Sequence, residues 1–139
     1  MAIDYGTKRL GIAMSDEMRM LASPRGVVNN SPTMVKELLE LIRMNSVRVV
    51  LLGIPRTLKN TESEMTAEVL RFGTTLEEAL ALQPELGAHL IRRDERLTSV
   101  MANQNIASRG LPKGKREVKS LRDEEAARIV LQEYLDAGV

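Results

Sequence analysis

The stretch AIDYGTKRLGIAM, residues 2–14, holds two short apolar runs separated by a polar turn. Residues 2–6 and 9–14 have the composition of strands, and Gly6-Thr7-Lys8 between them has the composition of a tight turn. The stretch therefore predicts a pair of strands at the start of a sheet. Asp4 lies inside the first run although aspartate is depleted in strands, so its carboxylate is a candidate functional group.

Beyond this pair, the chain alternates between strand and helix patterns. The run from Val47 to Leu52 is nearly continuous and β-branched, which is typical of a strand buried on both faces of a mixed or parallel sheet. We expect further strands at residues 19–28, 47–52 and 88–94, and helices at residues 33–45, 61–82, 97–108 and 120–136. This order predicts an α/β fold with a mixed five-stranded sheet, three antiparallel strands followed by alternating strands and helices, in one domain spanning residues 1–139.

The composition limits the chemistry that the chain can use. With 139 residues, of which 43% are hydrophobic and 28% charged, the chain is expected to fold as one globular domain. It has no cysteine and a single histidine, which excludes disulfides, thiolate nucleophiles and multi-histidine metal sites. A bound metal would need oxygen ligands, as Mg²⁺ and Mn²⁺ do. The lack of cysteine, of a long apolar run and of a signal peptide predicts a cytoplasmic protein without membrane contact.

Three carboxylates from distant parts of the chain stand out: Asp4, Glu95 and Asp123. Asp123 lies on or beside the apolar stripe of the last predicted helix, where Ala127 and Val130 follow at helical spacing. Glu95 follows the fifth predicted strand, at the end where such sheets commonly place a site. Divalent cations best relieve repulsion among converging carboxylates, as in two-metal phosphodiester hydrolysis. The pattern therefore indicates a metal site for cleavage of phosphodiesters.

Each of these carboxylates also has a purely structural explanation that the sequence leaves open. Asp4 would accept hydrogen bonds from turn amides at a strand end. Asp123 would be favoured by the dipole of the helix near whose start it lies. Glu95 stands within the charged run from Arg92 to Arg96, which is typical of solvated ion pairs.

Three segments resemble, in order, the motifs of one protein family. Residues Asp4–Asp16 look like its D-x-G-x-K-R-I-G-x-A-x-S-D start, and Asp94–Ser99 is similar to its D-E-R-L-T-T segment. Residues Asp123–Asp136 look like its D-x-x-A-A-x-x-I-L-Q-x-Y-L-D end. The family is the YqgF/RuvX family of Holliday junction resolvases, also described as pre-16S rRNA nucleases. One loop departs from it, because Asn60 and Ser63 replace the two later glycines of G-L-P-x-x-x-x-G-T-x-G.

The resemblance implies an RNase H-like fold in which Asp4, Glu95 and Asp123 are the metal ligands and the catalytic residues of a nuclease. The implied cofactors are two divalent cations, Mg²⁺ or Mn²⁺, with Asp4 bridging both. The implied substrate is RNA, in the form of pre-16S rRNA whose 5′ end is processed during ribosome biogenesis, or single-stranded or branched DNA. Ribosomal particles are expected partners, and the chain is expected to be a monomer or a homodimer.

Basic residues accompany these carboxylates in the sequence. Lys8 and Arg9 are candidates to hold a substrate phosphate, although a turn lysine and a strand arginine that packs its stem would have the same pattern. Residues 109–122 carry six basic side chains against one acid. We expect a loop from Arg109 to Lys119 that clamps phosphates, although a solvated charge run is the usual alternative. Its candidate nucleic-acid-binding residues are Arg109, Lys113, Lys115, Arg116 and Lys119.

Two other functions stay open beside rRNA processing. Resolution of DNA four-way junctions needs two symmetric cuts and therefore usually a two-fold dimer. A non-catalytic nucleic-acid-binding factor would need the basic loop but not the carboxylates. The start of the chain also resembles the first phosphate motif of actin-like kinases, but those enclose their nucleotide between two lobes, which one short domain does not provide.

Overall fold

The computed structural model describes the backbone of residues 1–55, 64–94 and 115–137, with side chains except at 64 and 115–122. Its elements, in chain order, are β1 (Ala2–Asp4), β2 (Arg9–Ser15), β3 (Ala22–Asn29), α1 (Met34–Met44), β4 (Val49–Ile54), α2 (Glu64–Ala81), the 3₁₀ helix η1 (Pro84–Leu86), β5 (His89–Asp94) and α4 (Lys115–Asp136). Within these ranges, none of the helices has the length and apolar character needed to span a membrane.

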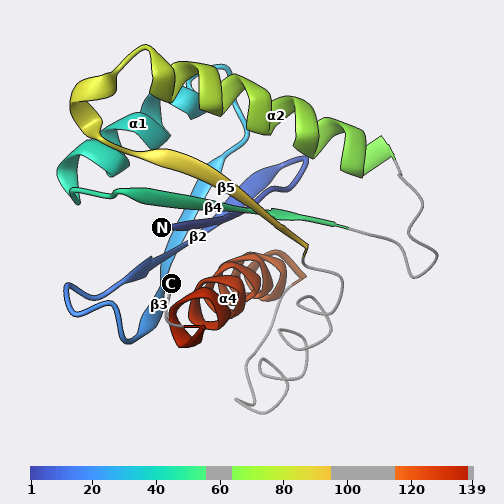
Figure 1. The fold of residues 1–139 in the computed structure, drawn as a ribbon. Coiled ribbons are helices and arrows are strands. Elements are labelled where there is room, and N and C mark those ends of the chain that lie inside the picture. The colour runs from blue at the N-terminus through green and yellow to red at the C-terminus, as the bar shows by residue number, and fades with distance from the viewer. Residues whose placement is uncertain (56–63, 95–114, 138–139) are drawn as a thin grey trace.

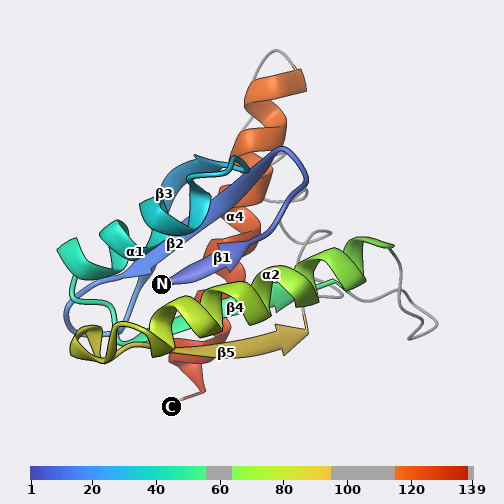
Figure 2. The ribbon, with the colours of Figure 1, turned by 90° about the horizontal axis from the view of Figure 1, so that it is seen from above.

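The five strands form one mixed sheet in the order β3-β2-β1-β4-β5. Strand β2 is antiparallel to β1 and β3, whereas β4 is parallel to β1 and β5. Helices α1 and α2 cover one face of the sheet and α4 crosses the other (Figures 1 and 2). The predicted α/β class with a mixed five-stranded sheet is confirmed.

Alternating side chains divide the core into two layers. Ile3 and Ile12 belong to the larger cluster beneath α1 and α2. Their neighbours Ala2 and Ala13 point to the opposite face and pack with α4 residues that include Ala127. Because Ala2, Gly11 and Ala13 on this face are small, α4 lies close to the sheet there.

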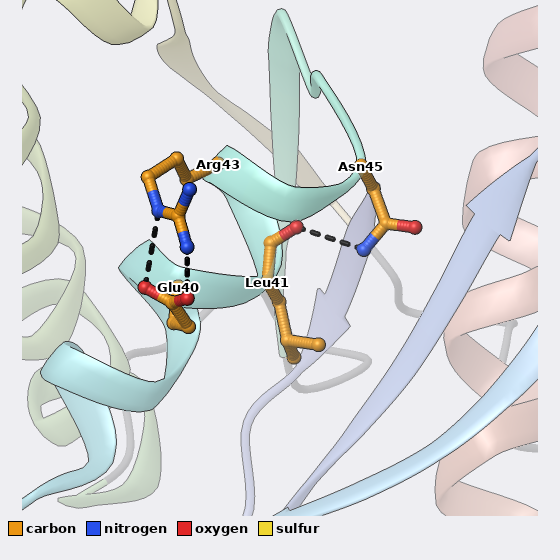
Figure 3. Close-up of polar contacts among 4 residues, drawn as sticks. All are labelled: Glu40, Leu41, Arg43 and Asn45. Carbon is orange, nitrogen blue, oxygen red and sulfur yellow. Dashed lines mark hydrogen bonds and ion pairs between the residues drawn. The ribbon is translucent and has the colours of Figure 1, made fainter.

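The last turn of α1 is closed by polar contacts shown in Figure 3. The Asn45 side-chain amide donates a hydrogen bond of 2.9 Å to the carbonyl oxygen of Leu41, which also accepts the Asn45 backbone N–H at 3.1 Å. Arg43 pairs with Glu40 one turn earlier, but both side chains are exposed, so this ion pair adds little stability. These contacts end the helix where the chain turns back toward β4.

The structure corrects several predicted boundaries, and β3 begins at Ala22 and not at residue 19. Strand β1 ends at Asp4 and not at Gly6, because Tyr5 and Gly6 make polar contacts with Glu68 and Asn30 instead of continuing the ladder. Helix α4 begins at Lys115, so residues 115–119 are helical and not part of the predicted loop. These residues follow Gly114 without another glycine or proline, and most of them favour helix. The helix predicted for residues 97–108 lies outside the described residues.

Candidate active site

Asp4 is the last residue of β1, and its side chain faces α4. Alternation fixes this direction, because Ala2 packs in the α4-side cluster and Ile3 packs in the cluster on the other face. Asp4 is half-buried. Its Cα is paired with that of Gly11 on β2, about 5 Å away for an antiparallel pair.

Gly11 brings Asp123 to the same place. A Cβ atom built on Gly11 would lie 2.1 Å from the carbonyl oxygen of Asp123 and 2.7 Å from the backbone nitrogen of Glu124. Only a glycine permits this approach, so α4 crosses β2 beside the partner of Asp4. Asp123 precedes Ala127 by one turn and Val130 by two, and both of those residues pack against the sheet. The two predicted carboxylates, Asp4 and Asp123, therefore share the layer between the sheet and α4.

The third predicted ligand, Glu95, lies outside the described residues. Within the described parts of the chain, no group of three histidine, cysteine or carboxylate side chains is arranged to hold a metal ion. The two carboxylates that the structure does place offer only oxygen donors, and both are half-buried. This donor set suits Mg²⁺ or Mn²⁺.

Glu124 adds a carboxylate that the sequence analysis missed. Strand β3 has a β-bulge opposite Gly11–Ala13 of β2, because Gly11 pairs with Val27 but Ala13 pairs with Pro24. Gly26 lies in this bulge with a φ of 93°. The backbone of Gly26 lies against the Glu124 side chain, since a Cβ built on Gly26 would be 3.7 Å from Glu124 Oε1. Burial raises the pKa of Glu124, the backbone N–H of Gly26 opposes this shift, and the charges of Asp123 and Glu125 add to it. The acidic run was visible in the sequence, but the bulge that receives it was not.

Glu125 is the second acid that the sequence analysis missed, and it is almost fully buried. Its side chain is 1% exposed and lies 2.7 Å from the Arg128 guanidinium, with a further bond of 2.8 Å from Arg128 Nε. Glu125 and Arg128 lie on α4 two and five positions after Asp123. An uncompensated buried carboxylate would be costly, so Arg128 helps to keep the acidic run from Asp123 to Glu125 folded within α4.

The predicted phosphate-binding residues are only partly placed. Lys8 is exposed in the turn after Asp4. Arg9 is half-buried on the α4 side of β2, and its Nη1 atom is buried without a hydrogen-bond partner among the described residues. Three of the remaining predicted residues lie in the first turns of α4, where the backbone but not the side chains is described: Lys115, Arg116 and Lys119. Arg109 and Lys113 lie outside the described residues.

The comparisons with known proteins agree with the motifs. A family model described as RuvX, Holliday junction resolvase, matches residues 1–137. The chain belongs to the RuvX family. Its relatives include proteins named "Putative pre-16S rRNA nuclease" from Christiangramia forsetii, 39% identical over 135 residues, and from Bacteroides fragilis, 38% identical over 139 residues. These alignments cover 97% of this chain, with 96% and 94% of the respective relatives.

Among solved structures, this RuvX family member is similar to RuvC from Thermus thermophilus. The alignment has a TM-score of 0.44 and 15% identity, and it covers 98% of this chain and 93% of the RuvC chain. The resemblance inferred from the three motifs is confirmed by the family match.

Proposed function

We propose that this RuvX family member is a divalent-cation-dependent nuclease that processes the 5′ end of pre-16S rRNA. The observation that carries the proposal is the contact of Gly11 with the Asp123 backbone, opposite Asp4 in the sheet. It brings together two carboxylates that are 119 positions apart in the sequence. The relatives' names supply the substrate, and we propose the cytoplasm and ribosomal precursor particles as its setting.

Asp4 and Asp123, together with Glu95, would hold the cations. When bound, such cations activate water and stabilise the leaving oxygen of a phosphodiester. The chain's own contribution is to fix two of these carboxylates on rigid elements, a central strand and a packed helix. Lys8 and Arg9 would bind substrate phosphates beside Asp4, and the buried Nη1 of Arg9 gains an acceptor when a phosphate arrives.

Resolution of four-way DNA junctions is the second candidate, and the description of the family model favours it. It differs from rRNA processing in the oligomeric state that it requires. Paired cuts across a junction require two active sites related by symmetry, and hence usually a dimer. A monomer that cuts RNA at one position would therefore favour rRNA processing.

Cleavage assays test both candidates. Labelled single-stranded RNA, single-stranded DNA and a four-way junction are incubated with Mn²⁺, Mg²⁺ or chelator, using the native chain, Asp4→Asn and Asp123→Asn. The matched control is Glu133→Gln, which removes an exposed carboxylate from the same helix as Asp123. We expect metal-dependent RNA cleavage in the native chain and the control, and at least about a 100-fold loss in both Asp variants, because second-shell changes already cost up to that factor.

The alternatives give distinct results. Paired symmetric nicks in the junction, with RNA left intact, would favour resolution. Tight binding without cleavage by any form, unchanged in the Asp variants, would show that the carboxylates are structural and that the protein is a binding factor.

A further inference from the structure

We infer that Asn30 is a positioning residue for substrate binding, because it fixes the turn that carries Lys8 and leads into Arg9. Asn30 follows β3 and lies 26 positions after Asp4 in the sequence. The inference rests on the proposed function, in that the turn is taken to meet a phosphate of the substrate beside Asp4.

Three hydrogen bonds join Asn30 to this turn. Its side-chain Nδ2 donates to the carbonyl oxygen of Gly6 at 2.8 Å and to the hydroxyl of Tyr5 at 3.0 Å. Its backbone N–H donates to the carbonyl oxygen of Lys8 at 3.0 Å. One residue thus holds the turn at its start and at its end, and both hydrogens of its amide are used.

A second anchor holds the same turn from α2. The Tyr5 hydroxyl donates to Glu68 at 2.9 Å, and its ring lies 4.9 Å from that of Phe72, centroid to centroid. The hydroxyl therefore accepts from Asn30 and donates to Glu68, which links β3, the end of β1 and α2 through one oxygen. Anchoring from two sides restricts the backbone of the turn.

The side chains that this turn presents are the ones able to meet a substrate. Thr7 and Lys8 are exposed, whereas Tyr5 and Gly6 are half-buried. The turn also sets the start of β2, where Arg9 faces the α4 side. A turn held in one conformation binds a phosphate more tightly than a flexible one, because less conformational freedom is lost on binding.

The test compares Asn30→Ala with Asn29→Ala, the exposed neighbour on β3. Binding of a short single-stranded RNA is measured by fluorescence anisotropy in chelator, and KM and kcat are measured with Mn²⁺. The loss of both side-chain hydrogen bonds predicts a rise of roughly 5- to 30-fold in Kd and KM for Asn30→Ala. We expect kcat to stay within about 2-fold, and Asn29→Ala to match the native chain. Partial unfolding would instead lower kcat and leave KM unchanged.

A double-mutant cycle with Lys8→Ala identifies the residue through which Asn30 acts. If the inference holds, Asn30→Ala weakens RNA binding much less in the Lys8→Ala background than in the native chain. Asn30→Asp serves as a second variant of similar size, because its carboxylate cannot donate to Gly6, and we expect it to bind RNA no better than Asn30→Ala. Equal Kd and KM for Asn30→Ala and Asn29→Ala, in a chain that cleaves RNA, would overturn the inference. A native chain that binds RNA without cleaving it would overturn only the proposed function.

Discussion

Gly11 and Asp123 are in direct backbone contact, although they belong to β2 and α4. A methyl group at position 11 would overlap the carbonyl oxygen of Asp123 at 2.1 Å and its carbonyl carbon at 2.2 Å. Both atoms belong to the main chain, so no rotamer change relieves the overlap. The glycine therefore determines how closely α4, with Asp123, approaches the sheet at the strand partner of Asp4.

Gly11→Ala is expected to lower both stability and activity. The added methyl group has to push α4 away from β2, and overpacking of this kind destabilises by about 3 kcal/mol or more when backbone is displaced. We expect a lower melting temperature, and a fall in metal-dependent cleavage that persists at temperatures where the variant is fully folded. Circular dichroism and the RNA cleavage assay measure the two effects.

Gly73→Ala is the matched control, since Gly73 lies on α2 against the other face of the sheet. Its added Cβ would lie 2.9 Å from Leu52 Cδ2, the far end of a flexible side chain. We expect a smaller loss of stability than for Gly11→Ala and normal cleavage by the folded protein. Equal cleavage by folded Gly11→Ala and folded Gly73→Ala would contradict a role for the Gly11 contact in the site.

Metal binding is expected to stabilise the native chain through Asp4 and Asp123. A cation at about 100 times its Kd adds roughly 2.7 kcal/mol to the free energy of unfolding. Differential scanning fluorimetry with Mn²⁺ should therefore raise the melting temperature of the native chain and of Glu133→Gln. Asp4→Asn and Asp123→Asn should show little or no rise, and a full rise in both would exclude these residues as ligands.

The sequence predicted the candidate carboxylates, but not the long-range contacts that position the residues around them. Asp4 in an apolar strand and Asp123 on an apolar helical stripe are local patterns, and the structure places both beside Gly11. The position of Glu124 beside Gly26 could not be predicted, because it depends on a β-bulge in a strand about a hundred positions away in the chain. The role of Asn30 was hidden for the same reason, since an asparagine before a proline-containing turn has an ordinary local explanation.

Glu124→Gln is expected to stabilise the fold at neutral pH. Burial and the neighbouring charges of Asp123 and Glu125 raise the pKa of Glu124 in the folded chain. The protonated form is thus favoured by folding, and its contribution to stability is present below the ordinary value of 4.5 and is lost as the pH rises through the raised value. Glutamine mimics the protonated group and keeps an acceptor for the Gly26 N–H.

Thermal melting of Glu124→Gln at two pH values tests whether the pKa of Glu124 is raised in the folded chain. The variant should melt above the native chain at about pH 7 and close to it at about pH 4. Glu124→Ala, which loses the acceptor as well as the charge, should be less stable than Glu124→Gln at both pH values. A gain for Glu124→Gln that is larger at the lower pH would contradict the raised pKa.

Arg128→Leu is expected to destabilise the chain strongly. It removes the cation that pairs with Glu125, whose side chain is 1% exposed, and the loss of one partner of a buried pair typically costs about 3 kcal/mol or more. Urea denaturation measures this loss, with Glu133→Gln as the control on the same helix. The double variant Arg128→Leu with Glu125→Met should recover most of the stability, because it leaves no buried charge behind. A double variant no more stable than Arg128→Leu would show that Glu125 is stabilised by other contacts.

The hydroxyl of Tyr5 is expected to ionise at a higher pH than that of an ordinary tyrosine. Burial raises the pKa of its hydroxyl above 10.0, the bond to Glu68 and the charge of Glu68 raise it further, and the Asn30 bond and the charge of Arg71 oppose the shift. Tyr134 is the second tyrosine of the chain, so the titration is followed by ultraviolet absorbance in a Tyr134→Phe background. Because folding favours the protonated hydroxyl, the stability that it contributes is present below pH 10.0 and is lost as the pH rises through the raised value. Adding Glu68→Gln should move the midpoint back toward the ordinary value, and an unchanged midpoint would show that burial alone sets the pKa of Tyr5.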